Sequence, residues 1–228
     1  MANHLDLEEQ EQLDQLKHFW KQYGNAITWA LILVLSAFAA WNFYQQWQRS
    51  QATQAASMYE EVERIVKLKD GNKIDRVFSD LKEKFASTTY AQQAGLLVAQ
   101  HYYTTGKFEL VKATLTWVAE NSADRGYQAI AKLRLAAVLV DSKEFDAALT
   151  HLNGPYPLGF SALVSDRKGD IYLLQGKKSE AIREYASAFK NFDELSDYKR
   201  LVQVKLNSLG VDPMPVTTSI AQLSEGGK

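Results

Sequence analysis

The longest apolar stretch of the chain lies close to its N-terminus. Residues 22–48 carry no charged side chain, and residues 26–44 within them read AITWALILVLSAFAAWNFY. As an α-helix with a rise of about 1.5 Å per residue, these 27 residues extend roughly 40 Å. Because the hydrocarbon core of a bilayer is about 30 Å thick, the pattern predicts one transmembrane helix over residues 22–48, in contact with the lipid bilayer.

Aromatic side chains are gathered at both ends of this stretch. Rings with an apolar body and a polar edge concentrate at the two headgroup levels of a membrane. The spacing therefore favours a helix that spans the bilayer from one interface to the other. The predicted membrane-interface anchors are Trp20, Tyr23, Trp41, Tyr44 and Trp47.

Two other interpretations of the stretch stay open at this point. Ala37 and Ala39 form an A-x-A site typical of a cleavable signal peptide, but the preceding region is long and acidic, and the aromatic side chains continue past the site. A buried helix of a soluble protein would have to hide an apolar surface on every side. We expect a membrane span rather than either of these.

Beyond Arg49 the apolar side chains recur at helical spacing, and no alternating run long enough for a sheet is present. One such helical face is formed by Ile74, Val77, Phe78, Leu81 and Phe85. We therefore expect an all-α domain of helices roughly 10 to 18 residues long, joined by short turns.

Several residues predict where these helices begin and end. Gly71, Gly106 and Gly176 stand where helices should end, because glycine adopts the left-handed conformation of a helix C-terminus. Thr89, followed three residues later by Gln92, suits a capping box that begins a helix.

A repeat of helix pairs follows from the period of the pattern. Helix pairs of about 34 residues are typical of tetratricopeptide repeats. The clearest copy is residues 162–195, with weaker copies before it and a capping helix expected near Leu206. The small and large side chains that let its two helices close are Gly169, Tyr172, Gly176, Ala181, Tyr185 and Ala188. The predicted fold class is all-α: an N-terminal transmembrane helix followed by a tetratricopeptide-like helical-hairpin solenoid.

Charge divides the chain at the same places. Residues 1–21 carry five acids and two bases, whereas residues 49–210 carry 20 acids and 23 bases, and neither is basic enough to predict nucleic-acid binding. The lysines before the span favour a cytoplasmic N-terminus. We expect a cytoplasmic amphipathic segment (1–21), the transmembrane helix (22–48), a periplasmic repeat domain (49–210) and a mobile C-terminal tail (211–228).

Recognisable catalytic chemistry is missing from the sequence. There is no Cys, the four His are not spaced as HxxxH or HExxH, and no nucleophile elbow, phosphate-binding loop or dinucleotide fingerprint occurs. We predict no catalytic residue, no metal site and no cofactor. A membrane-anchored hydrolase using Asp166 and Asp170, one helical turn apart, is a minor alternative to a solvated or capping role for these carboxylates.

Binding is the better expectation, because repeat solenoids present a concave face lined by the first helix of each pair. The predicted face is mainly apolar and has Lys69 as its only cation, which favours an apolar segment or partner helix. Equally open is that several of its side chains close the core of a tightly wound solenoid. The predicted partner-binding groove consists of Tyr59, Val62, Val66, Leu96, Gln100, Tyr103, Leu133, Ala137, Val140, Asp166, Asp170 and Leu173.

The block SALVSDRKGDIYLLQGKKSEAIREYASAF, residues 161–189, together with the acidic N-terminus and the single span, resembles the YfgM family. Members of that family are ancillary subunits of the SecYEG translocon in the inner membrane of Gram-negative bacteria. The likeness covers nearly the whole chain.

The resemblance implies a non-enzymatic, single-pass scaffold or chaperone-like adaptor with a periplasmic repeat domain. The implied partners are the SecYEG translocon, a PpiD-like membrane-anchored periplasmic chaperone and translocating polypeptides, so that periplasmic chaperones receive secreted and outer-membrane proteins. An adaptor of another envelope-assembly or cell-division complex stays open as an alternative.

Overall fold

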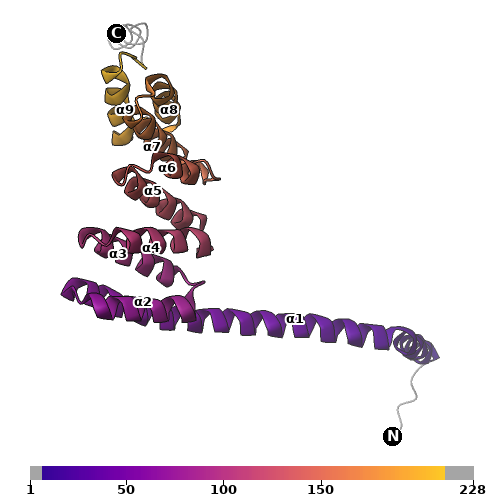
Figure 1. The fold of residues 1–228 in the computed structure, drawn as a ribbon. Helices are drawn as coiled ribbons and strands as arrows, with labels where there is room; N and C mark the ends of the chain where they lie inside the picture. The colour runs from indigo at the N-terminus through magenta and orange to yellow at the C-terminus, as the bar shows by residue number, and fades with distance from the viewer. Residues whose placement is uncertain (1–6, 214–228) are drawn as a thin grey trace, which may run out of the picture. The chain divides into compact units, whose positions relative to one another are not determined.

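The computed structural model describes residues 7–213, with side chains from residue 11 onward (Figure 1). Every regular element in these residues is helical, so the all-α prediction is confirmed. The elements are α1 (Leu7–Leu68), α2 (Gly71–Phe85), α3 (Thr89–Thr104), α4 (Phe108–Asn121), α5 (Arg125–Asp141), α6 (Phe145–Leu152), the short 3₁₀ helix η1 (Leu158–Phe160), α7 (Ser161–Leu174), α8 (Lys178–Asn191) and α9 (Asp197–Ser208).

The chain divides into two compact units, Met1–Thr53 and Gln54–Lys228. In the described part of the first unit, α1 runs without interruption and nearly all its side chains are exposed. No helix begins or ends at the predicted boundaries near residues 21 and 48, because the span is part of a longer helix. The domain boundaries therefore stay predictions, and the tail beyond residue 213 lies outside the described residues.

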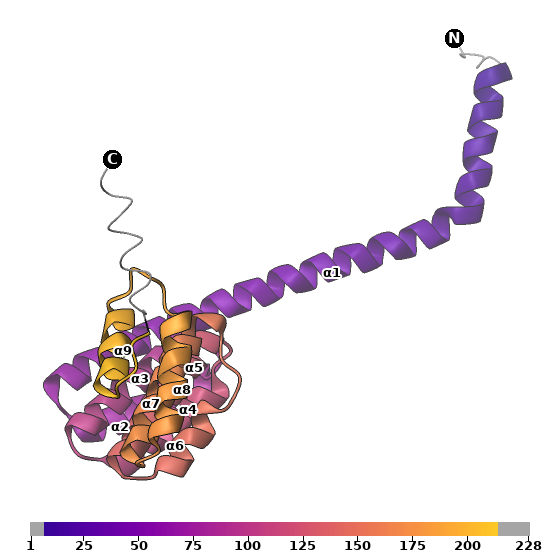
Figure 2. The ribbon, with the colours of Figure 1, turned by 90° about the horizontal axis from the view of Figure 1, so that it is seen from above.

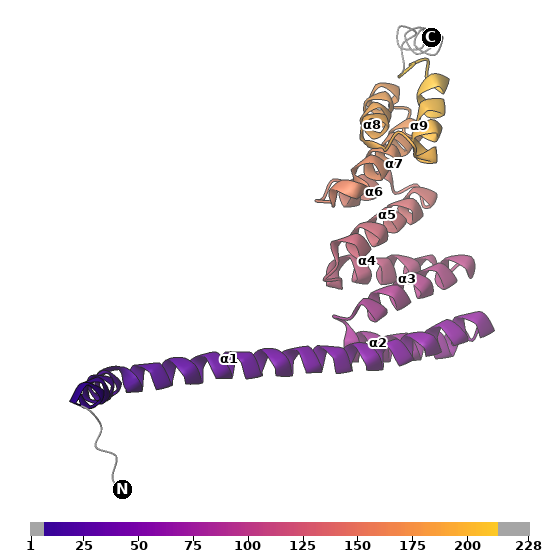
Figure 3. The same cartoon turned by 180° about the vertical axis from the view of Figure 1, so that it is seen from behind.

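The second unit is a stack of helical hairpins. α3 packs on α4, α5 on α6 and α7 on α8, and α9 packs on α8. From the side, α2 to α9 follow one another in sequence order along the stack (Figures 1 and 3), and the view along the stack superimposes them (Figure 2). The prediction of paired hairpins is confirmed. The 62-residue α1 and the eight-residue α6 fall outside the expected helix lengths.

The turns within the hairpins use left-handed residues, as expected, but not always glycine. Gly106 (φ +74°) and Gly176 (φ +75°) follow the ends of α3 and α7. At the equivalent turns after α1 and α5 the left-handed residues are Lys69 (φ 57°) and Lys143 (φ 63°). Gly71 begins α2, so the prediction that it ends a helix is wrong.

The helix start near residue 88 also differs from its prediction by one position. Thr88 is the N-cap of α3, and its hydroxyl accepts a hydrogen bond from the Ala91 backbone N–H at 3.3 Å. Gln92 does not reach back as a capping-box partner. Its buried amide donates instead to the Ala86 carbonyl at 2.6 Å, so it fixes the turn between α2 and α3.

Two hydrophobic clusters hold the stack together. The larger extends from the last turns of α1 through α2 to α6 and ends on α7 at Val164 and Ile171. The smaller joins α8 to α9 around Tyr185, Val202 and Leu206. At Gly169 a Cβ atom would lie 2.5 Å from the Tyr185 ring, so this position of the repeat pattern requires glycine for close packing of α7 on α8.

Candidate functional site

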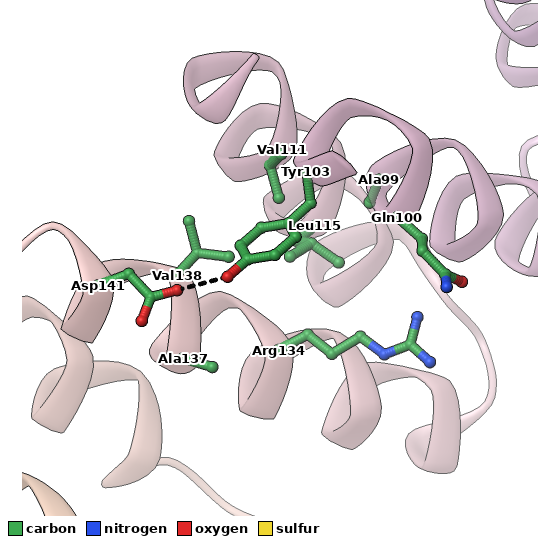
Figure 4. Close-up of a pocket in the computed structure, with 9 residues that line it drawn as sticks. All are labelled: Ala99, Gln100, Tyr103, Val111, Leu115, Arg134, Ala137, Val138 and Asp141. Carbon is green, nitrogen blue, oxygen red and sulfur yellow. Dashed lines mark hydrogen bonds between the residues drawn. The ribbon is translucent and has the colours of Figure 1, made fainter. Parts of the chain in front are cut away.

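The clearest hollow in the repeat domain lies between α3 and α5, the first helices of two successive hairpins, with α4 behind them (Figure 4). Its volume is about 310 Å³. Buried aliphatic side chains form its floor, and polar side chains stand at its two ends. The lining residues are Ala99, Gln100, Tyr103, Val111, Leu115, Arg134, Ala137, Val138 and Asp141.

One end of the pocket is closed by Tyr103 and Asp141. The Tyr103 hydroxyl donates a hydrogen bond of 2.9 Å to Asp141 Oδ2, which ties α3 to α5. The Tyr103 ring also packs edge-on against Phe108, at 5.7 Å between centroids. The hydrogen bond to the Asp141 carboxylate and its negative charge raise the pKa of Tyr103 above its ordinary value. This end of the pocket therefore presents the Asp141 carboxylate as a hydrogen-bond acceptor that Tyr103 holds in place.

The other end carries Arg134 and Gln100, whose polar ends lie near each other in Figure 4. Arg134 Nη1 donates a long hydrogen bond of 3.4 Å to the Leu96 carbonyl, and its side chain is exposed. This end is cationic and rich in donors. The sequence interpretation counted Lys69 as the only groove cation, and the position of Arg134 in the pocket corrects it.

The structure divides the predicted groove residues into different environments. Gln100, Tyr103 and Ala137 line the pocket together. Val62 and Leu96 are buried in the main core, so they do not line an open surface, as the core alternative anticipated for some positions. Leu173 is exposed. The residues that are half-buried against the core are Tyr59, Val66, Leu133 and Val140.

Asp166 and Asp170 on α7 form an ion-pair cluster with α9. Lys205 Nζ lies 2.7 Å from Asp166 Oδ1 and 2.7 Å from Asp170 Oδ1. The Tyr185 hydroxyl donates to Asp170 Oδ1 at 2.7 Å, and Arg167 lies 3.8 Å from its other oxygen. The two carboxylates therefore hold α9 against α7 rather than facing an open groove.

Burial dominates the protonation equilibria of this cluster. Burial raises the pKa of the Asp166 carboxyl, the hydrogen bond and charge of Lys205 oppose this shift, and the negative charge of Asp170 adds to it. Burial, and then the hydrogen bond to Asp170, also raise the pKa of Tyr185. The phenol consequently stays protonated and acts as a donor at neutral pH.

Sequence reasoning missed Lys205 and Arg134, the two cations that define these polar clusters. Lys205 precedes Leu206 on the predicted capping helix and looks like an ordinary solvated lysine. It meets its partners across 35 and 39 residues, a distance that helical periodicity does not report. Among the described residues, no group of three or more His, Cys, Asp or Glu is placed to hold a metal ion.

The described part of α1 contains one segment apolar and long enough to cross a membrane, with a mean hydropathy of 1.8 and none of that window buried. The predicted anchors at its ends are all exposed: Trp20, Tyr23, Trp41, Tyr44 and Trp47. Among the five, Tyr44 and Trp47 contact each other, at 6.2 Å between ring centroids.

Stacked helical hairpins with a concave pocket define a tetratricopeptide-like protein, and the family model described as a tetratricopeptide repeat-like domain matches residues 17–211. Comparison with curated proteins is more specific. The chain belongs to the YfgM family of ancillary SecYEG translocon subunits. The resemblance seen in the sequence is confirmed.

Three relatives, each named as an ancillary SecYEG translocon subunit, illustrate the match. The protein from Neisseria gonorrhoeae is 34% identical over 210 residues, covering 92% of this chain and all of the relative. That from Escherichia coli (strain K12) is 29% identical over 206 residues, covering 89% and 97%. That from Haemophilus influenzae is 28% identical over 203 residues, covering 89% and 98%. Comparison with solved structures gives no match.

Proposed function

We propose that this chain is a non-enzymatic, membrane-anchored adaptor that joins the SecYEG translocon and helps periplasmic chaperones receive emerging polypeptides. The observation that carries the proposal is the pairing of an exposed apolar helix with a repeat domain in one chain, in a family whose relatives are named for the translocon. A tether at the membrane raises the effective concentration of the repeat domain near a neighbouring complex, so individually weak contacts suffice.

The tether makes a direct prediction. Deleting residues 1–48 should abolish co-purification of SecYEG with the chain, while circular dichroism still reports a folded helical domain. A second variant, in which residues 26–44 are replaced by a leucine–alanine span of equal length, separates anchoring from helix recognition. Unchanged co-purification after the deletion would contradict the tethering idea.

The proposed orientation places residues 1–21 in the cytoplasm and residues 49–210 in the periplasm. The chain has no Cys, so single cysteines can be introduced without a background. Gln12→Cys and Ser179→Cys are suitable because both side chains are exposed. In intact spheroplasts, a membrane-impermeant maleimide should label only Ser179→Cys, and labelling of only Gln12→Cys would reverse the orientation.

The proposed partners of the repeat domain are a PpiD-like membrane-anchored chaperone and translocating polypeptides. Tyr103 at the pocket and half-buried Leu133 on α5 suit photo-reactive replacement. Cross-links from these positions to translocon-associated chaperones or nascent chains would support the proposal. Cross-links confined to cell-division or outer-membrane assembly proteins would favour the alternative adaptor function.

The hydrolase alternative depends on Asp166 and Asp170. Their contacts with Lys205 support a structural role. The Lys205 ammonium lies 2.7 Å from one oxygen of each carboxylate, and so occupies oxygens that a general base would need to accept a proton from a substrate. The Asp166→Asn, Asp170→Asn double variant tests this directly. If chaperone-dependent secretion persists in cells where the double variant is still folded, an acid–base role for the pair is excluded.

A further inference from the structure

The pocket between α3, α4 and α5 has an apolar floor that is already packed from behind. Ala99, Val111, Leu115 and Val138 belong to the main core, yet each contributes to the lining (Figure 4). An apolar group entering the pocket therefore meets a preformed apolar surface. Such a surface favours a large aliphatic or aromatic side chain over a polar one.

Arg134, at the cationic end of the pocket, differs from two other cations of the domain that carboxylates hold in place. Lys205 contacts Asp166 and Asp170, and Lys112 contacts Glu109 and Glu144. Among the described residues, no carboxylate lies within ion-pair distance of Arg134, and its guanidinium makes one long hydrogen bond, to the Leu96 carbonyl. The guanidinium therefore retains donors for a carboxylate.

The two ends give the pocket a polarity. Arg134 and Asp141 lie seven residues apart on α5, about 10 Å along the helix axis at 1.5 Å per residue. Asp141 repels a second carboxylate at its own end, so a bound acidic group is directed to Arg134 and Gln100. An extended chain rises about 3.3 Å per residue, so one to three residues link an apolar side chain on the floor to that acidic group.

We infer that this pocket binds a protein segment in which a large apolar side chain lies within three residues of a carboxylate, with the carboxylate on Arg134. The inference rests on the proposed adaptor function and adds the chemistry of the segment that the groove selects. A purely apolar partner leaves Arg134 unpaired, and a basic one is repelled by it. Charge complementarity therefore separates acidic–apolar segments from other translocating or chaperone sequences.

A matched peptide set tests the inference on the full chain in lipid nanodiscs. The probes are acetylated, amidated nine-residue Gly–Ser peptides with one Leu and, two residues later, Glu, Gln or Lys. Methyl resonances of Val111, Leu115 and Val138 report both the site and the affinity. The Glu peptide should bind about fivefold more tightly than the Gln peptide, and the Lys peptide more weakly still, because one partly exposed charge pair is being compared.

Variants of the pocket locate the effect. Arg134→Gln should remove the preference for the Glu peptide, and Arg134→Glu should transfer it to the Lys peptide; both replace an exposed side chain, and the methyl spectrum verifies the fold. Ala137→Trp should fill the pocket and weaken the Glu peptide by about tenfold. Ala147→Trp, on exposed α6 surface outside the pocket, is its control and should change nothing.

Equal affinities for the three peptides, an unchanged preference in Arg134→Gln, or no methyl shift at millimolar peptide would overturn the inference. Evidence that the pocket holds either of two other occupants would also overturn it. If removing residues 216–228 strengthened all peptides alike, the chain's own tail would be the occupant. If Arg134→Gln instead changed the number of chains per nanodisc assembly, the occupant would be a second copy.

Co-purification of SecYEG by the unmodified chain tests the proposed function separately, since it does not depend on peptide charge. Failed co-purification with the charge preference intact would overturn the translocon assignment alone. Intact co-purification without a charge preference would overturn this inference alone.

Discussion

Two regions of the chain carry equally apolar side chains and differ in what covers them. In α1, Leu33 and Phe43 keep 71% and 75% of their surface exposed. In the repeat domain, Leu81 and Leu115 keep 0% and 1%, because neighbouring helices cover them. Apolar surface is stabilised only when it leaves water, so the first region needs lipid or a partner helix where the second uses its own fold. Matched substitutions in the two regions test this difference.

The largest expected effect comes from truncating one leucine in each region. Leu81→Ala removes a fully buried side chain, so the free energy of unfolding of the repeat domain should fall by about 2–5 kcal/mol. Leu33→Ala should leave that free energy unchanged. Denaturant unfolding in detergent, followed by far-ultraviolet circular dichroism, measures both, and equal losses would show that the apolar stretch of α1 belongs to the same core.

A charge should reverse the order of sensitivity. Leu33→Arg places a guanidinium in the middle of the proposed span, at a cost of about 2.5–3.5 kcal/mol for membrane insertion. Leu158→Arg, at a side chain that is 92% exposed in the repeat domain, should be neutral. Extraction of membranes with alkaline carbonate separates the cases: Leu33→Arg should appear in the soluble fraction. Full retention of that variant in the membrane would argue against the span.

The sequence predicted features of the fold that rest on local chemistry. The uncharged stretch, the hairpins and the left-handed Gly106 and Gly176 all follow from spacing or from a single residue's backbone freedom. The misplaced cap at Thr88 has a local cause too, since adjacent threonines offer two equally good caps. Lys143 could not be predicted as a left-handed residue, because a residue with a Cβ atom disfavours that conformation and nothing local to the sequence marks this position.

The candidate site was less accessible to sequence reasoning. Helical spacing assigned Val62 and Leu96 to the groove face, but it does not report how closely successive hairpins approach, and both are buried. Arg134 was passed over because its own helix neighbours are apolar and nothing local marks it as facing a pocket. Burial and pairing across hairpins depend on the superhelical geometry of the stack, which no single repeat encodes.

The next largest effect is expected where α7 packs closely on α8. Gly169→Ala adds a methyl group 2.5 Å from the Tyr185 ring, so either the ring or the helix must shift, and the stability of the repeat domain should fall by about 2–3 kcal/mol. Gly159→Ala is the control, because nothing lies within 4 Å of its added carbon. Thermal unfolding compares them. A Gly169→Ala variant as stable as the control would mean that α8 is free to move away from α7.

The smallest effect is expected at the ion pairs that join α9 to α7. Lys205→Met keeps a side chain of similar length and removes the ammonium group that lies between Asp166 and Asp170 and 5.2 Å from the centroid of the Tyr185 ring. Asp166 is nearly buried, but the Lys205 side chain keeps 23% of its surface exposed, so the loss at neutral pH should be on the order of 1 kcal/mol rather than the larger cost of a fully buried pair. Lys190→Met, at an exposed position on α8, is the matched control.

The pH dependence of that loss distinguishes electrostatics from packing. Burial already raises the pKa of Asp166 above its unfolded value of about 3.9, and removing Lys205 should raise it further. Above pH 4 and up to the raised pKa, the folded variant binds more protons than the unfolded chain, so its stability falls as pH rises. The deficit relative to the unmodified chain should therefore shrink as the pH falls and the Asp166 carboxyl becomes protonated in both folded proteins. A deficit of equal size at every pH would assign Lys205 a packing role, and the ion pairs would then contribute nothing to holding α9 in place.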